Sequence, residues 1–367
     1  MVAFSALEAL KNIRSYPERV RLRRLRHGMS RASGAEAVVG FGGVLDSGRL
    51  IHGGAVKLLS LREGFPCDDL ACNVLYLVSS ALPAFPGELV AACQRKGIRF
   101  VWNQNGVGYP AWAGWQAGRH NRPMRMLRAR ADFVIYQSRF CQRSAEKFLG
   151  AATQPSRVLL NPVNVEKFSP APEARRAGPL RLLAMGTQNY PDRVLRLLDA
   201  LEILRAGGLE ATLTVAGNLL WKNGEAQVTE KIRSQGLVGV VHRRAAFNRE
   251  EAVDLYRSHD LLLHPKAMDP CPTVVAEALA CGLPVVASAS GGLPEMVSPE
   301  CSRLIPVPED WETLRTPSGN EIADAVSDLL PRLVRASQSA RARAIESFSQ
   351  KPWLTAHAEI FSNLLRN

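Results

Sequence analysis

The pattern that most constrains the fold is an alternation of short apolar runs with helix-like segments, which occurs twice along the chain. In the first half, Ala37–Phe41, Asn73–Val78 and Phe133–Tyr136 are apolar runs of strand length. The Pro- and Ala-rich stretch Ser169–Pro179 interrupts the pattern, which restarts at Leu180–Met185. Because strands that alternate with helices form parallel sheets covered on both faces, we expect an α/β protein with two Rossmann-like domains.

This alternation also sets the expected domain bounds. The expected order is a basic N-terminal helical segment at 1–35, a first Rossmann-like domain at 36–168, a linker at 169–179, a second Rossmann-like domain at 180–345, and a C-terminal helix at 346–367 that packs back on the first domain. At the start of the second domain we predict a loop over Gly186–Asp192 and a helix over Arg193–Arg205. With 46% hydrophobic and 22% charged residues, the chain is neither disordered nor fibrous.

The positive charge of the chain is confined to its first half. Residues 1–168 contain 24 Lys and Arg against 11 Asp and Glu, whereas residues 169–367 contain 22 against 23. Segments 1–31 and 114–147 each hold eight basic and two acidic residues. Such asymmetry predicts an anionic partner for the first domain alone. An anionic membrane surface is the sharper hypothesis, and a solvated charged face is the competing one.

Cysteines and apolar segments exclude several classes of protein. The seven cysteines have no CxxC spacing, so neither a disulfide framework nor a structural zinc site is expected. Glu8 and Lys11 interrupt the apolar start of the chain, which argues against a secretory signal. The longest apolar segment, Val74–Gly87, is too short to span a bilayer. We therefore expect a cytoplasmic protein, peripheral on the inner face of the membrane if it binds there.

The most informative stretch for chemistry is His264–Val297. A strand ends at about His264, a proline-rich loop follows, and a helix begins near Thr273. The helix therefore points its free N–H groups at the crevice beyond the strands, which suits a phosphate. Thr273 and Glu277 share one helix face, so a diphosphate at the helix start places a ribose near the Glu277 carboxylate.

Asp269 and Glu277 are separated by seven residues, and the motifs EALACGLPVV and GGLPE follow. At this point the sequence resembles the retaining glycosyltransferases of family 4. Gly53-Gly54, Tyr136–Ser138 and Asn161–Asn164 resemble further motifs of that family, so the likeness extends over about residues 38–297. It implies the GT-B fold, in which two Rossmann-like domains face each other across a cleft.

The resemblance also implies roles for individual residues. The donor-binding residues would be Gly53, Gly54, Gly186, Arg193, Lys266, Asp269, Cys271, Pro272, Thr273 and Glu277. Within this set, Asp269 lies by the sugar hydroxyls, Cys271–Thr273 offer main-chain groups to the diphosphate, and Glu277 binds the ribose. Thr187 stands where the family has an arginine, so Arg196 or Lys266 would have to contribute to the phosphate clamp.

A second departure concerns catalysis. The family places a histidine after a strand of the first domain, whereas here that strand ends in Asn103, Gln104 and Asn105. One of these amides would have to supply the polar group that the histidine provides in the family. The predicted catalytic set is Asn105, Asp269 and Arg193. The resemblance implies a retaining reaction without an enzyme nucleophile. The sequence has no DxD motif, which argues against a metal-bridged diphosphate, and we expect no metal and no cofactor.

The expected reaction transfers a sugar from a nucleotide-sugar donor to a hydroxyl acceptor, either a glycan or a lipid-linked precursor of cell-surface polysaccharide or glycolipid. Trp112, Trp115 and His120 could form an acceptor platform, with a packed loop core as the competing interpretation. A nucleotide-sugar epimerase or sugar phosphorylase on the same scaffold is the alternative enzyme. No motif in the sequence supports a nucleic-acid-binding protein. The sequence also lacks a GxGxxG motif after a strand, which argues against a Rossmann oxidoreductase.

Overall fold

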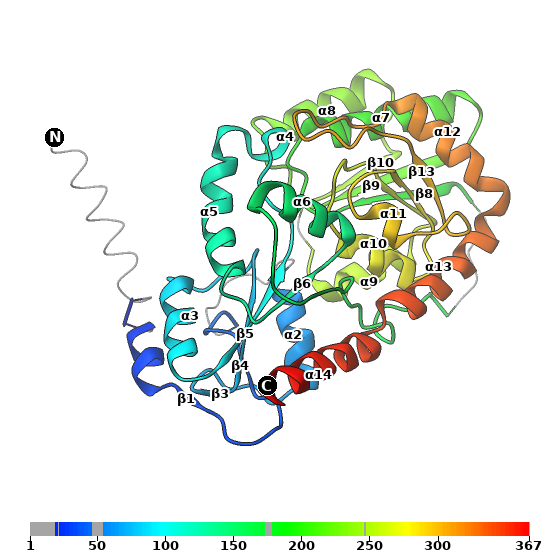
Figure 1. Cartoon of the computed structure of the whole chain (residues 1–367). Coiled ribbons are helices and arrows are strands. Elements are labelled where there is room, and N and C mark those ends of the chain that lie inside the picture. The colour runs from blue at the N-terminus through cyan, green and yellow to red at the C-terminus, as the bar shows by residue number, and fades with distance from the viewer. Residues whose placement is uncertain (1–18, 21, 46–53, 173–177, 246, 367) are drawn as a thin grey trace, which may run out of the picture.

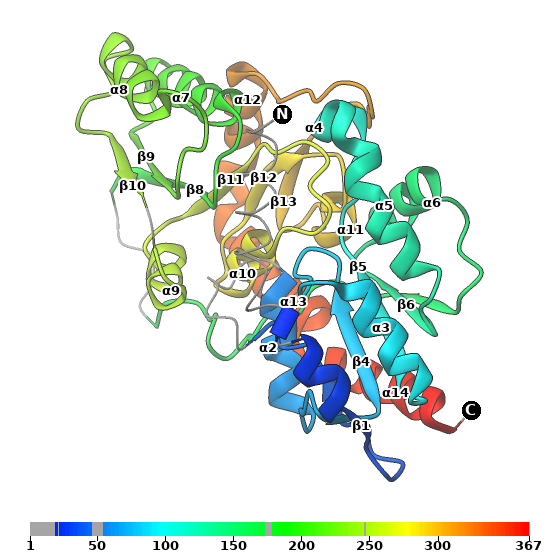
Figure 2. The ribbon, with the colours of Figure 1, turned by 90° about the vertical axis from the view of Figure 1, so that its left-hand side faces the viewer.

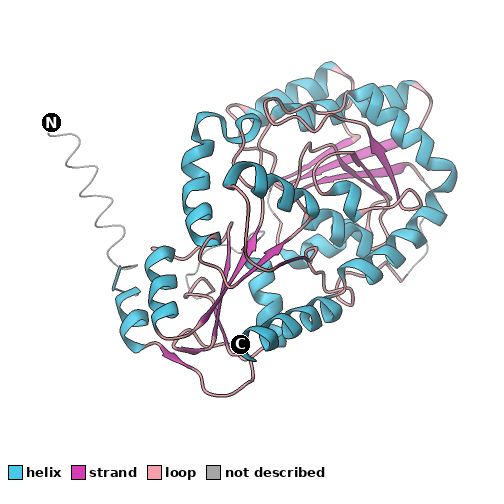
Figure 3. Cartoon of the chain, viewed as in Figure 1, coloured by secondary structure: helices cyan, strands magenta, loops and turns pink. Residues whose placement is uncertain are grey.

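The computed structural model describes residues 19–20, 22–45, 54–172, 178–245 and 247–366. Each of two lobes contains a parallel sheet with helices packed along it (Figures 1 and 3). Most of the predicted N-terminal helical segment, together with His52, Gly53 and the middle of the linker, lies outside the described residues. Within the described residues, no helix combines the length and the apolarity needed to cross a bilayer.

The first domain contains a five-stranded sheet whose strands lie side by side in chain order. The strands are β2 (Val39–Gly40), β4 (Val74–Val78), β5 (Arg99–Gln104), β6 (Phe133–Tyr136) and β7 (Ser156–Val158). A separate pair joins β1 (Ser30–Arg31) to β3 (Ala71–Cys72). All five residues of β4 are buried, as expected for a central strand of a parallel sheet covered on both faces.

Short helices connect these strands. They are α2 (Gly54–Gly64), α3 (Pro86–Arg95), α4 (Pro110–Ala113), the 3-10 turn η1 (Gly114–Gln116), α5 (Ala117–Arg128) and α6 (Arg139–Leu149). The side chain of Ser138 caps α6 by accepting a hydrogen bond from the Cys141 N–H. The three strands predicted above for the first domain are confirmed to within a few residues at their ends.

The second domain has a six-stranded parallel sheet in the order β10-β9-β8-β11-β12-β13. Its strands are β8 (Leu180–Met185), β9 (Ala211–Ala216), β10 (Val241–Arg244), β11 (Leu261–His264), β12 (Val285–Ser288) and β13 (Ser302–Ile305). Strand order reverses between β8 and β11. At such a switch point the loops after the two strands diverge and leave a crevice for a ligand.

Helices cover both faces of this second sheet (Figure 2). They are α7 (Pro191–Ala206), α8 (Gly224–Ser234), α9 (Arg249–Arg257), α10 (Thr273–Ala280), α11 (Leu293–Met296), α12 (Gly319–Leu329), the 3-10 turn η2 (Leu330–Arg332) and α13 (Leu333–Phe348). Helix α7 starts at Pro191, two residues before the prediction, because proline is tolerated in a first helical turn. Arg193 therefore belongs to that turn, and the predicted loop is shorter.

The last helix, α14 (Gln350–Arg366), returns to the first domain and packs along α2. Trp353, Ile360 and Phe361 share a hydrophobic cluster with residues of β2 and β4. His357, fully buried, forms a hydrogen bond of 3.1 Å with the Tyr76 hydroxyl. The first domain is thus completed by residues that follow the whole of the second domain.

Candidate active site

A cavity of about 320 Å³ lies between the two domains, at the carboxyl ends of β8 and β11. It occupies the switch point of the second sheet, which is where ligands bind in open α/β sheets. Nine of the predicted site residues line it: Gly54, Asn105, Gly186, Arg193, Lys266, Asp269, Cys271, Pro272 and Thr273. The structure therefore brings most of the predicted set together around one space.

Arg193 supplies a cation to the second-domain wall of the cavity. Its side chain is 8% exposed and its guanidinium lies 5.4 Å from the centre of the Tyr190 ring. Burial lowers the pKa of this guanidinium, against the influence of Asp269. Among the described residues, none accepts a hydrogen bond from Arg193, so its donors remain available to an anion in the cavity.

Asp269 lies between two basic side chains. Lys266 Nζ is 2.8 Å and His264 Nε2 is 3.1 Å from the same carboxylate oxygen, Oδ2. Burial alone would raise the pKa of Asp269, but Lys266 and His264 together hold that pKa well below its usual range. Burial also lowers the pKa of His264, so a neutral imidazole donates its Nε2–H to the carboxylate. Asp269 is therefore a fixed negative charge.

Two glycines hold the loop that carries Asp269. Gly291 has a φ of +68°, and a Cβ there would lie 2.5 Å from the Asp269 carbonyl oxygen. A Cβ on Gly292 would lie 2.0 Å from the Pro270 carbonyl oxygen, while its N–H donates to the Asp269 carbonyl at 2.9 Å. The glycine pair of the GGLPE motif thus lets two backbone segments touch.

The start of α10 faces the cavity. Pro272, Thr273 and Val274 line it, and no described residue accepts a hydrogen bond from the N–H groups of Thr273 and Val274. The positive end of the helix dipole adds to the charge of Arg193 and Lys266. These groups together suit a diphosphate better than a neutral ligand.

Glu277 lies one turn further along α10 and is not among the residues that line the cavity. Its Oε2 accepts a hydrogen bond of 3.0 Å from the hydroxyl of Tyr256. Burial raises the pKa of Glu277 to about 7, although the Tyr256 bond opposes that shift. In an otherwise apolar and buried helix, this carboxylate is the exception that needs a ligand or a proton.

The three candidate amides of the first domain differ in whether they line the cavity. Asn103 and Gln104 are at most 1% exposed and their side chains bond within the domain, whereas Asn105 lines the cavity. The backbone N–H of Asn105 donates to Ser79 Oγ at 2.9 Å, and its Oδ1 accepts from Lys57 Nζ at 2.6 Å. Lys57 was missed in the sequence, where its only signal is a position one helical turn after Gly54.

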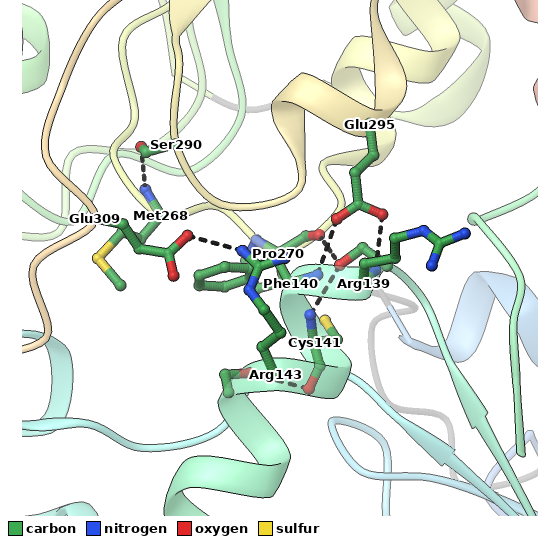
Figure 4. A network of polar contacts seen from close by, with 11 residues as sticks. Arg139, Phe140, Cys141, Arg143, Met268, Pro270, Ser290, Glu295 and Glu309 are labelled. Atoms are coloured by element: carbon green, nitrogen blue, oxygen red, sulfur yellow. Dashed lines mark hydrogen bonds and ion pairs between the residues drawn. The ribbon is translucent and has the colours of Figure 1, made fainter.

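The two domains touch around the cavity through α6. The Ser138 hydroxyl donates to the Pro270 carbonyl at 2.7 Å, next to Asp269. The Glu295 carboxylate of α11 accepts from the backbone N–H groups of Arg139 and Phe140 at 2.7 and 2.8 Å (Figure 4). The first domain therefore holds the loop that forms the opposite wall of the cavity.

The predicted acceptor residues lie outside the cavity wall. Trp112 and Trp115 are 48% and 85% exposed, and the rings of Trp112 and His120 are 5.6 Å apart. The Tyr190 hydroxyl approaches the Trp112 carbonyl at 3.5 Å, which places α4 beside the Arg193 side of the cavity. The packed-core interpretation fails for Trp115 because most of its surface is open to solvent.

No metal-binding cluster of three or more His, Cys, Asp or Glu side chains occurs in the part of the chain that the structure describes. Among the described residues that line the cavity, the side chains of Arg193 and Lys266 and the start of α10 carry positive charge.

The fold is the GT-B fold of glycosyltransferases. The chain superposes on Anabaena HepE, solved in complex with UDP and glucose, with a TM-score of 0.69, 17% identity, and coverage of 89% of this chain and 99% of that one. Sucrose-phosphate synthase from Thermosynechococcus elongatus gives a TM-score of 0.64 at 19% identity, covering 85% and 77%.

Sequence comparison points to the same class. Residues 166–330 match the family model Glycosyl transferases group 1, so the second domain carries the pattern of that family. The chain is 30% identical to MMP alpha-(1->4)-mannosyltransferase of Mycolicibacterium hassiacum over 245 residues, which is 61% of this chain and 55% of that protein. It is 25% identical to glycogen synthase of Mycobacterium tuberculosis over 256 residues, covering 68% and 59%. The matches span little more than half the length of these curated relatives.

Proposed function

We propose that this protein is a retaining glycosyltransferase of family 4 that transfers a sugar from a nucleotide-sugar donor to a hydroxyl group. The observation that carries the proposal is the cavity at the switch point of the second sheet, where Arg193, Lys266 and the start of α10 converge. The GT-B fold and the family match of residues 166–330 support the same reaction.

In this proposal the donor diphosphate lies at the start of α10. Arg193, which has no hydrogen-bonded partner among the described residues, binds the phosphates together with Lys266 and the N–H groups of Thr273 and Val274. The ribose lies along α10, where the Glu277 carboxylate accepts hydrogen bonds from its hydroxyls. Gly54 lines the cavity, so its backbone can approach the phosphates from the first domain with no side chain in the way. A Cβ at this position would also clash with the Ser80 hydroxyl.

The sugar lies between Asp269 and Asn105, which line the cavity from opposite domains. The bond from the anomeric carbon to the diphosphate oxygen breaks, and a bond forms to the acceptor oxygen on the same face. The acceptor proton passes to the departing phosphate oxygen, so no enzyme nucleophile is required. Fixed positive groups stabilise the leaving diphosphate and take the role that a metal ion has in other transferases.

The acceptor is proposed to meet the rim formed by α4 and α5. Trp112, Trp115, Arg119 and Arg122 are exposed there, and no described side chain pairs with either arginine. Part of the predicted basic face is structural instead: Arg128 is buried and bonds to the Gly150 carbonyl at the end of α6. The remaining cations favour an anionic surface, and we propose a glycan or lipid-linked acceptor at the cytoplasmic face of a membrane.

Two experiments test these proposals. Incubation with a panel of nucleotide-sugars and acceptors should release a nucleoside diphosphate and yield a glycoside whose anomeric configuration, read by NMR, equals that of the donor. Release without a glycoside, or an inverted product, would contradict the assignment. Co-sedimentation with anionic and neutral vesicles should show salt-sensitive binding to the anionic ones. Arg119→Glu combined with Arg122→Glu should weaken this binding, whereas Arg233→Glu, on α8 of the second domain, should leave it unchanged.

A further inference from the structure

Lys57 of α2 is a buried cation beside the cavity. It is 2% exposed, and its Nζ donates to three amide oxygens: Asn103 Oδ1 at 2.7 Å, Asn105 Oδ1 at 2.6 Å and Gln137 Oε1 at 3.1 Å. Among the described residues, no carboxylate lies within ion-pair distance of it. A buried ammonium group is normally paired with an anion, so this arrangement needs an explanation.

The three bonds fix the orientation of the cavity wall. Asn105 and Gln137 both line the cavity, and Lys57 takes the oxygen end of each amide. The Asn105 Nδ2 therefore turns the other way and donates to Ser80 Oγ, which also lines the cavity. Since an amide can rotate by half a turn at little cost on its own, Lys57 decides which end of Asn105 faces a ligand.

The titratable groups around Lys57 do not neutralise it near pH 7. Cys141 of α6 and Cys271 of the loop before α10 have their pKa values raised to about 12 by burial. Burial also raises the pKa of Tyr76 in β4 and lowers the pKa of His357 in α14 to about 3. All four groups are uncharged, so Lys57 keeps an uncompensated positive charge. Burial lowers the pKa of Lys57 itself to about 8.

We propose that Lys57 is a positioning residue for sugar transfer: it orients the Asn105 amide toward the donor sugar. The inference rests on the proposed transferase function. Lys57 itself does not line the cavity and acts through Asn105 and Gln137. The protonated amine can hold all three amides, whereas the neutral amine has one N–H fewer.

A double-mutant cycle tests this role. Lys57→Met and Asn105→Ala should each lower kcat by about 100-fold, as expected when a group that contacts the substrate is misplaced, with a much smaller change in the donor KM. The double variant should have a kcat no lower than that of Asn105→Ala alone, because the two substitutions remove the same interaction. Lys96→Met is the matched control, since Lys96 donates at 2.6 Å to the Met29 carbonyl in the same domain, and it should keep wild-type kcat.

The pH profile provides a readout that a purely structural lysine would not affect. In the wild-type protein kcat should fall as pH rises through about 8, where Lys57 loses its proton, and Lys57→Met should lack this limb. Wild-type kcat in Lys57→Met, additive effects in the cycle, or a flat wild-type profile would each overturn the proposal.

Calorimetric binding of nucleoside diphosphates shows whether each variant is folded. If Lys57→Met does not bind them, the pH profile of the unaltered chain still decides the role of Lys57. A wild-type protein that releases no nucleoside diphosphate from any donor would instead contradict the proposed function.

Discussion

Glu295 of the second domain caps helix α6 of the first domain, since its Oε1 accepts the backbone N–H of Phe140 at 2.8 Å. Its other oxygen accepts the N–H of Arg139, so one carboxylate satisfies two donors at a helix start. A negative charge at this end of a helix is also favoured by the helix dipole. The last residue of the GGLPE motif therefore joins the two domains rather than binding the donor.

Removal of this cap should weaken the contact between the two domains. Glu295→Ala should lower the free energy of unfolding by about 2 kcal/mol, because two hydrogen bonds to a charged group are lost. It should also weaken binding of nucleoside diphosphates, since the Pro270 loop is held by the same helix start. Thermal unfolding and calorimetry provide the measurements. Glu309→Ala, which removes an exposed ion pair with Arg143, is the control and should change stability by less than about 1 kcal/mol. Equal effects of the two changes would contradict the role of the cap.

Gly292→Ala should distort the loop that carries Asp269. The new Cβ would lie 2.0 Å from a backbone oxygen, so the chain must shift, at a cost of about 1–3 kcal/mol. We expect weaker nucleoside diphosphate binding as well as a lower Tm. Gly87→Ala is the matched control, because a Cβ there meets nothing within 4 Å. An unchanged dissociation constant for Gly292→Ala would show that the loop does not depend on this contact.

Asp269→Asn should separate catalysis from donor binding. The substitution keeps the shape of the side chain but removes the charge that Lys266 and His264 hold in place. We expect kcat to fall by about 100-fold or more, whereas affinity for the nucleoside diphosphate product should change by only a few fold. Initial rates of diphosphate release and calorimetry measure the two effects. A kcat within about threefold of wild type would remove Asp269 from the predicted catalytic set.

Glu277 should make donor binding depend on pH near neutrality. Its pKa of about 7 means that the carboxylate gains charge as pH rises from 6 to 8, so affinity for nucleoside diphosphates should increase over that range. Glu277→Gln should bind them more weakly and without this pH dependence. Equal pH dependence in both proteins would indicate that Glu277 does not bind the ribose.

The same substitution should have the opposite effect on stability. Between pH 4.5 and 7 the folded protein retains a proton on Glu277 that the unfolded chain has lost, so wild-type stability decreases as pH rises through this window. Glu277→Gln should therefore be more stable than wild type at pH 8, by about 3 kcal/mol, with little difference at pH 4. A lower Tm of the variant at pH 8 would contradict this.

Sequence alone predicted the elements whose burial is unambiguous. Strands such as β4 and β11 are continuous apolar runs because both faces of a central parallel strand are covered. By contrast, β10 reads VHRR and β7 reads SRV, and both lie at sheet edges. Edge strands tolerate charged side chains, so their sequence carries little strand signal.

The residues of the candidate site also differ in how well the sequence predicts them. Asp269 and Thr273 follow from a local motif, in which a strand end, a loop and a helix start fix their positions relative to each other. The role of Lys57 can be recognised only in the folded chain, where the ends of β5 and β6 bring Asn105 and Gln137 against α2. Glu295 stands in a recognised motif, but its partner lies more than 150 residues away in the sequence. The spacing of residues along the sequence does not reveal contacts between partners that lie so far apart in the chain.

The return of α14 to the first domain imposes an order on biosynthesis. Trp353, Ile360 and Phe361 complete the core beneath β2 and β4, yet a ribosome makes them only after the entire second domain. Until then the apolar side chains of α2 and β4 that these residues contact have no cover from α14. Apolar surface that is left uncovered in this way makes a partly synthesised chain prone to aggregation until α14 has packed.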